Sequence, residues 1–170
     1  MICNIITYEA ISLLARPCSA DKEMAEAFIA EAQRVEVKPR VGDALYMAIS
    51  DDAPGGRFCV LLNGGKWTDC RGGARYLTGL KTALAYYALA RIVRDGNIQA
   101  STYGAVVKDD QYSAEAEKTE RQRQYRELFS QADSYMAEVL DYLESNRDLF
   151  PEYQCKASRK NNRIRFKVIG

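Results

Sequence analysis

The chain contains no histidine, so it lacks the side chain that most often acts as a general base near neutral pH. Nucleophile activation by Ser–His or Cys–His pairs is excluded for the same reason, and the commonest zinc ligand is missing. An enzyme built from this sequence would have to use carboxylates, lysine, tyrosine or cysteine. The composition therefore favours a protein that acts through binding, and we predict that it is not an enzyme.

Acidic residues are the first alternative source of chemistry. Two adjacent pairs, Asp51–Asp52 and Asp109–Asp110, lie in segments rich in helix-breaking residues, where a solvated turn or a helix cap is the ordinary interpretation. A triplet at three-residue spacing could chelate a divalent ion from one side of a helix: Glu138, Asp141 and Glu144. A solvated helix face is by far the more common reason for such a triplet, so we predict no metal site.

Cysteine is the second alternative, but the positions of the cysteines do not favour a reactive site. They are odd in number and widely separated: Cys3, Cys18, Cys59, Cys70 and Cys155. This pattern is typical of reduced thiols in a cytosolic protein. Only Cys70 and Cys155 are followed by a cationic residue, which lowers a thiol pKa, and neither has a histidine to act as base. We predict no catalytic residue and no cofactor.

Charge is distributed unevenly along the chain, although the formal net charge is only +1. After residue 153 there are six basic residues and no acidic ones: Lys156, Arg159, Lys160, Arg163, Arg165 and Lys167. The first 153 residues hold the other 18 basic residues and all 23 acidic ones, which gives them a net charge of −5. Within the tail, Ile164, Phe166 and Val168 alternate with basic or polar residues, as in a strand with one buried face. The chain therefore divides into a helical domain, residues 1–153, and a basic arm or strand, residues 154–170.

This basic arm has two interpretations. Its cations could follow the phosphates of a nucleic acid, with Phe166 stacking on a base. They equally suit an acidic protein surface, including the body of a second copy, and the arm could add a strand to an exposed sheet edge. The near-zero net charge of the whole chain favours protein over nucleic acid as the partner.

Apolar residues recur at helical spacing in five segments, and caps or breakers bound most of them. The expected helices span residues 7–15, 21–36, 41–49, 80–95 and 113–147. In the second of these, which Ser19 or Asp21 would cap, the predicted buried stripe includes Phe28 and Val35. The last carries a heptad-like seam over residues 125–143, behind a highly charged start.

Short β segments are expected between the helices. Residues 58–62 fit either a strand or a helical turn, and residues 67–70 are predicted to be extended. Residues 97–108, which contain the apolar run at 103–107, are predicted to be a loop leading into a short strand. The predicted fold class is mainly α, a helix bundle of about four to five helices with a few short β segments and an extended basic C-terminal arm. No apolar run approaches the roughly 20 residues that cross a bilayer, and no secretory leader is expected.

Tyrosine is abundant in the predicted helices. The 11 tyrosines include five at helical positions: Tyr86, Tyr87, Tyr125, Tyr135 and Tyr142. A tyrosine combines a large apolar ring with a hydroxyl that tolerates water. We expect about half of the tyrosines to lie in the core or at its rim and the others to suit contacts with proteins.

Several segments resemble structural proteins of phages and prophages of the Bacteroidales-type tailed viruses. The resemblance is carried by residues 61–65, 79–93, 103–108, Asp110, Tyr112, Ser113, the long helix and residues 166–170. It covers roughly positions 58–170, and its motifs have no catalytic meaning. In helical layout the chain is similar to head-tail connector or head-completion proteins, which assemble as rings between the portal and the tail.

The resemblance implies a non-enzymatic virion assembly protein, a head-tail connector or adaptor subunit found in the host cytoplasm during assembly and then in the virion. Its implied partners are the portal, neighbouring connector copies and tail-side proteins, with a homo-oligomer in the assembly or a monomer when isolated. A nucleic-acid-binding module that uses the basic tail is the alternative, and no membrane partner is expected. The predicted interface residues are Tyr103, Val106, Lys108, Lys156, Arg159, Lys160, Arg163, Arg165, Phe166 and Lys167.

Overall fold

The computed structural model describes residues 4–51, 56–69, 72–95, 98–101, 104–107 and 118–153, and it is mainly α-helical, as the sequence predicts. In chain order its elements are α1 (Tyr8–Leu14), α2 (Lys22–Ala32), a π-helix η1 (Gln33–Val37), α3 (Lys38–Val41), α4 (Asp43–Asp51), α5 (Cys59–Asn63), β1 (Gly65–Thr68), β2 (Ala74–Leu77), α6 (Leu80–Asp95), β3 (Ile98–Ser101), β4 (Gly104–Val107) and α7 (Lys118–Ser145). The strands form two separate antiparallel hairpins, β1–β2 and β3–β4. The basic arm, residues 154–170, lies outside the described residues.

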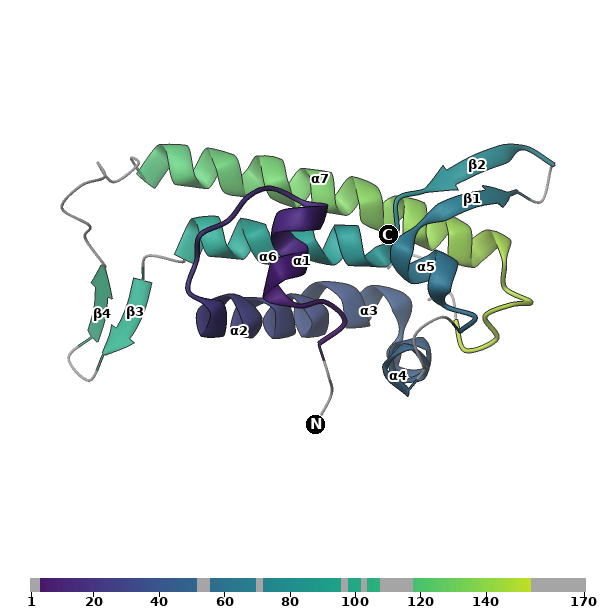
Figure 1. Ribbon diagram of the computed structural model, residues 1–170, viewed down its shortest axis with the longest axis horizontal. Coiled ribbons are helices and arrows are strands. Elements are labelled where there is room, and N and C mark those ends of the chain that lie inside the picture. Colours follow the sequence, from purple (N-terminus) through teal and green to yellow (C-terminus); the bar gives the residue numbers. More distant parts are fainter. Residues whose placement is uncertain are drawn as a thin grey trace, which may run out of the picture.

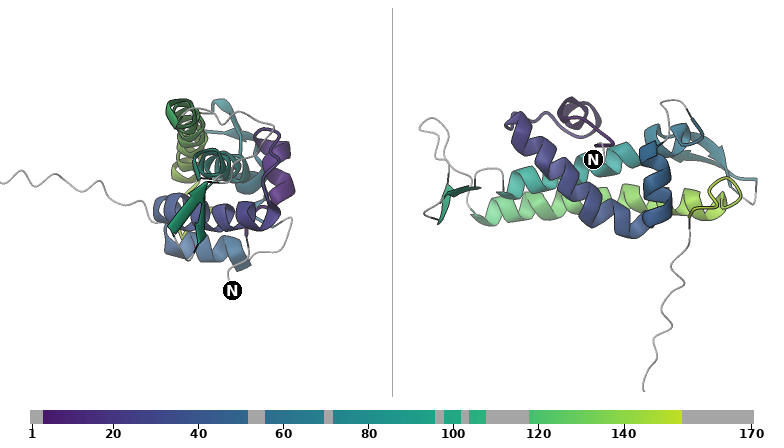
Figure 2. Two further views of the ribbon diagram at one scale, coloured as in Figure 1. Left: turned by 90° about the vertical axis from the view of Figure 1, so that its left-hand side faces the viewer. Right: turned by 90° about the horizontal axis from the view of Figure 1, so that it is seen from below.

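Helix α6 is the centre of the bundle. Seen end-on in Figure 2, it lies between α7, α1 and α2. Figures 1 and 2 show α7 running along it, while α1 and α2 cross it. Its bounds are the predicted ones, and its predicted core face is buried. Four of its buried residues are alanines: Ala83, Ala85, Ala88 and Ala90. Because alanine adds only a methyl group, helices can approach α6 closely from several sides.

Helix α7 runs back along α6 for the length of the body (Figure 1). The predicted seam is confirmed, since Leu128, Ala132, Met136, Val139 and Leu143 are all buried. Aromatic contacts reinforce it through two pairs across the helices, Tyr86–Tyr135 and Tyr87–Phe129, with ring centroids 5.2 and 5.1 Å apart. The start predicted at residue 113 lies outside the described residues.

Helices α2, η1 and α3 form one continuous rod, which corrects the predicted end of the second helix. The rod does not stop near residue 36 but runs through Pro39 and ends at Gly42. A proline ring clashes with the carbonyl four residues earlier in an ordinary α-helix. Here the preceding turn is widened, with the N–H of Lys38 bonded to the carbonyl of Gln33, and the helix continues.

The buried face of the rod also differs from the predicted one. Val35, predicted to be in the apolar stripe, is 53% exposed, whereas Val37 is buried. The buried face of α2 runs through Ala25 and Ile29, with Phe28 only partly buried beside it. Both buried residues precede the widened turn, so the predicted face is about one residue out of register from the start of the rod, and Val35 lies on its outer side at the ordinary 3.6-residue period.

Asp21 caps the rod, as the sequence predicts. Its Oδ1 accepts a hydrogen bond from the N–H of Met24 at 3.1 Å. Replacing an N-cap aspartate with alanine leaves that N–H without its partner, so we expect Asp21→Ala to lower the free energy of unfolding by about 1 kcal/mol. Chemical denaturation measures this loss, and Asp21→Asn should retain most of the stability. Equal losses in both variants would contradict a capping role.

The β1–β2 hairpin is joined to the body at a point where two backbones touch. Residues 59–63 resolve as the short helix α5, so the ambiguous segment is helical. Gly64 and Gly79 follow α5 and β2, and both have positive φ angles, +82° and +101°. A Cβ on Gly79 would lie only 2.6 Å from the backbone nitrogen of Gly64. Trp67 and the buried Leu77 anchor the hairpin, the indole meeting the Tyr142 ring at 5.2 Å.

The second hairpin, β3–β4, lies beyond the far end of α6, so the two hairpins are at opposite ends of the bundle (Figure 1). The strand predicted within residues 103–107 is present as β4, where Val106 pairs with Gln99. Its partner strand β3 was not predicted.

Candidate protein-interaction surfaces

A buried arginine on α6 holds the central helix to the α2–η1 rod. Arg91 is only 7% exposed. Its Nη1 donates to Glu31 Oε1 at 2.6 Å and its Nη2 donates to Glu36 Oε1 at 2.9 Å. The Glu36 side chain is 14% exposed and that of Glu31 is 48% exposed. The Glu36 pair is therefore the more shielded from water of the two.

Further ionic contacts connect η1, through Arg40 of α3, to α7. Glu36 lies 4.0 Å from Arg40, and the Arg40 guanidinium contacts Asp133 Oδ1 at 2.8 Å. Tyr87 accepts a hydrogen bond from Arg40 and donates one to Asp133 at 2.5 Å. We call this connected set the polar chain: Glu31, Glu36, Arg40, Tyr87, Arg91 and Asp133. It links α2, η1 and α3 to both α6 and α7.

The acidic triplet of α7 is not the uniformly solvated face that the sequence indicated. Glu138 Oε2 accepts hydrogen bonds from the N–H and hydroxyl of Thr78, at 3.2 and 2.7 Å. It thereby fixes the backbone immediately before α6. Glu144 pairs with Arg147, while Asp141 is exposed. Within the described part of the chain, no group of three or more acidic or cysteine side chains is placed to hold a metal ion.

Of the predicted interface residues, Val106 is within the described part of the chain. Val106 belongs to β4, and only its backbone pairing is described. The others fall outside the described residues: Tyr103, Lys108, Lys156, Arg159, Lys160, Arg163, Arg165, Phe166 and Lys167. Cys70, Cys155, Asp52, Asp109 and Asp110 also lie outside them, whereas Cys18 and Cys59 are free thiols.

The five tyrosines named in the sequence analysis are buried or partly buried, whereas Tyr76 is exposed to solvent. Tyr87 and Tyr142 are buried, and Tyr86, Tyr125 and Tyr135 are partly buried against the core. Tyr76 on β2 is 68% exposed and lies opposite Lys66 of β1. Burial does not alternate along β2, since Ala74, Arg75 and Tyr76 are all exposed and only Leu77 is buried, so the sequence carries no period-2 signal for this outer face.

The exposed side of α7 carries a stripe of charged and small residues. The α7 stripe consists of Arg123, Arg126, Ser130, Ser134, Ala137, Asp141 and Glu144, all of which are exposed. At about 100° per residue these positions fall within a sector of about 80° of the helix surface. Its N-terminal end is cationic and its C-terminal end anionic. An open hollow of about 660 Å³ borders the cationic end, lined among the described residues by Thr119, Gln122, Arg123, Arg126 and Glu127.

Several tyrosines and carboxylates have pKa values that are shifted further away from neutral pH. Burial raises the pKa of Tyr142, and burial together with Tyr86 raises the pKa of Tyr135. A hydrogen bond from Arg123 lowers the pKa of Glu120, and one from Arg57 lowers the pKa of Glu152. These phenols stay protonated and these carboxylates stay ionised at pH 7, as befits groups in structural contacts.

None of the helices in the described residues combines the length and apolar character needed to cross a bilayer.

Comparison with known proteins gives one match. A family model, described as Family of unknown function (DUF6712), matches residues 37–163. No curated protein and no solved structure matches the chain.

Proposed function

Because that model covers most of its length, the chain belongs to the DUF6712 family, and from this premise we propose a function on the evidence of its residues and fold. The protein is a non-enzymatic virion assembly protein of a tailed phage or prophage. It serves as a head-tail connector or adaptor subunit, and it works through contacts with other proteins in the host cytoplasm and then in the virion.

One observation carries the proposal: the polar residues of the body hold its helices together, and a hairpin extends from each end (Figure 1). The polar chain engages two arginines, three carboxylates and a tyrosine in contacts with one another. Such a body is stiff along its axis, since the helices are tied at several levels. A subunit that transmits contacts between neighbours needs this property more than it needs a reactive pocket.

The hairpins offer the kind of surface on which an assembly contact forms. Each is a sheet of two strands, so each strand has an edge that is not paired with a third strand among the described residues. Such edges accept an added strand from a partner. The β1–β2 hairpin presents the exposed Tyr76, and tyrosine is enriched at protein interfaces.

The basic arm supplies the complementary element in this proposal. It carries six cations, whereas the first 153 residues have a net charge of −5. Opposite charges on the arm and on a neighbouring body favour association and set its orientation. The arm and the segment around Tyr103, Val106 and Lys108 are therefore the proposed contacts with portal, tail-side proteins or neighbouring copies.

Removal of residues 154–170 tests this role. We expect the shortened protein to keep its helical circular dichroism and its melting temperature, because the described core lies within residues 4–153. It should no longer join an assembly with the portal protein encoded in the same genomic neighbourhood, as measured by multi-angle light scattering of the mixture.

Replacing the six tail cations with glutamine is the matched control, since it keeps the arm and removes only its charge. Loss of assembly in both variants assigns the contact to charge. Unchanged assembly after the deletion would overturn the role of the arm. A gel shift with DNA that weakens steeply with salt would instead favour the nucleic-acid-binding alternative.

A further inference from the structure

The charges of the α7 stripe are complementary to those of a second copy that runs in the opposite direction. Its midpoint lies between Asp133 and Ser134. Arg123 and Glu144 are equally far from that point on opposite sides, and so are Arg126 and Asp141. Two copies of the stripe laid antiparallel about this midpoint therefore place a cation opposite an anion at each of these positions.

We infer that two copies of this chain pair through the α7 stripe, antiparallel and about a two-fold axis at this midpoint. The symmetry repeats each contact, so the Arg123–Glu144 and Arg126–Asp141 pairs each occur twice. Near the axis, Ser130 of one copy lies opposite Ala137 of the other. These small side chains let the two helix backbones approach closely.

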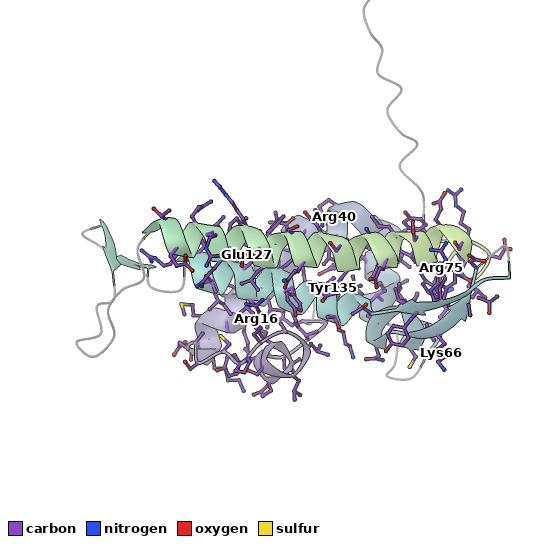
Figure 3. All side chains as sticks on the ribbon, turned by 90° about the horizontal axis from the view of Figure 1, so that it is seen from above. Arg16, Arg40, Lys66, Arg75, Glu127 and Tyr135 are labelled. Carbon is purple, nitrogen blue, oxygen red and sulfur yellow. The ribbon has the colours of Figure 1, made fainter. Side chains whose placement is uncertain are left out.

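The stripe is accessible in the described structure. Figure 3 looks down on α7, and no other described element crosses over it in this view. No ion pair is present for Arg126 or Asp141 among the described residues, so both charges are free for a partner. Arg123 pairs with Glu120 and Glu127, and Glu144 pairs with Arg147. These contacts lie at the surface of one helix and exchange for intermolecular ones at little cost.

The direction of the charges along α7 is a second reason for an antiparallel partner. Glu144 lies in the last helical turn, where the helix dipole disfavours a carboxylate, and Asp141 lies just before it. An antiparallel copy brings its own cationic half to this anionic end. The dipoles of the two helices then also point in opposite directions. A parallel copy would set arginine against arginine and acid against acid.

The pairing surface is one helix face per copy, below the usual size of a stable dimer interface. We therefore expect a weak dimer with a dissociation constant of about 10–100 µM that weakens with added salt. The α7 pair leaves both hairpins free for other contacts, and it is independent of the phage role proposed above.

Sedimentation velocity on the full chain and its charge variants tests the pairing. At low salt, about 50 mM NaCl, and protein concentrations up to about 200 µM, the natural chain should dimerise, and about 500 mM NaCl should dissociate the dimer. Arg126→Glu alone and Asp141→Arg alone should each weaken dimerisation about tenfold or more, because each places like charges together twice. An equimolar mixture of the two variants should form a heterodimer, since both contacts are then between opposite charges.

Arg16→Glu is the matched control, as it makes the same charge change at an exposed site beside α1, away from α7 (Figure 3). It should dimerise like the natural chain. A natural chain that stays monomeric over the whole concentration range would overturn the inference. Equal effects of Arg16→Glu and Arg126→Glu would do so too, as would failure of the mixture to form heterodimers.

Discussion

Gly79→Ala is expected to lower the free energy of unfolding by about 3–4 kcal/mol, through two effects that add. The φ angle of Gly79 is +101°, a conformation that costs an alanine about 1–2 kcal/mol. The added Cβ would also lie 2.6 Å from the Gly64 nitrogen and 2.8 Å from the Leu62 carbonyl oxygen. Both are backbone atoms, so the clash is relieved only by parting the hairpin from α5.

Gly42→Ala separates these two effects. Gly42 has a similar φ angle, +89°, but a Cβ there has no neighbour within 4 Å. It should therefore cost only about 1–2 kcal/mol. Urea denaturation followed by circular dichroism measures both variants. Similar losses at the two glycines would mean that the backbone contact between Gly64 and Gly79 does not constrain the fold.

Arg91→Met is expected to destabilise the protein by about 3 kcal/mol, because it removes one partner of a shielded ion pair. The methionine fills much of the same volume but leaves Glu36, 14% exposed, without its 2.9 Å contact. Among the ion pairs of the described residues, the one with Arg40, at 4.0 Å, is left to offset that charge. Glu31 is half exposed and regains solvation from water, so most of the loss comes from Glu36.

A double-mutant cycle with Glu36→Gln tests this cause by denaturation. If the unpaired carboxylate is responsible, Arg91→Met should cost much less in the Glu36→Gln background than in the natural chain. Arg34→Met, an exposed arginine on the same rod, is the control and should change stability by no more than about 0.5 kcal/mol. If the losses of the two single variants simply add in the double variant, the destabilisation by Arg91→Met does not come from the unpaired Glu36 carboxylate.

Local patterns predicted the helices whose periodicity is undisturbed. The bounds of α6 were predictable because apolar residues repeat from Leu80 and Gly96 follows its end. The seam of α7 was predictable for the same reason. The rod of α2, η1 and α3 was not, because a widened turn lets the helix continue through Pro39, where a proline usually marks an end, and because its buried face lies about one residue away from the predicted one.

The surfaces were harder to predict than the core. The tyrosines on the helices were expected partly at interfaces but pack against the body. Tyr86 and Tyr87 lie on the central helix α6, whereas Tyr135 and Tyr142 on α7 pack on Tyr86 and Trp67. Tyr76, in a four-residue strand too short for a clear pattern, faces solvent. The charge order of α7 was present in the sequence, yet only the packing of the helix shows which side is exposed.

The sequence by itself determined that this is a mainly α-helical chain without histidine, with an acidic body and a basic tail, because these properties depend on composition and on neighbours a few residues apart. Only the tertiary structure decided how the polar residues are used. Arg91 meets Glu36 and Glu31 across 55 and 60 positions of sequence, and Thr78 meets Glu138 across 60. Contacts between residues so far apart form only when the helices pack, so no local spacing reveals them.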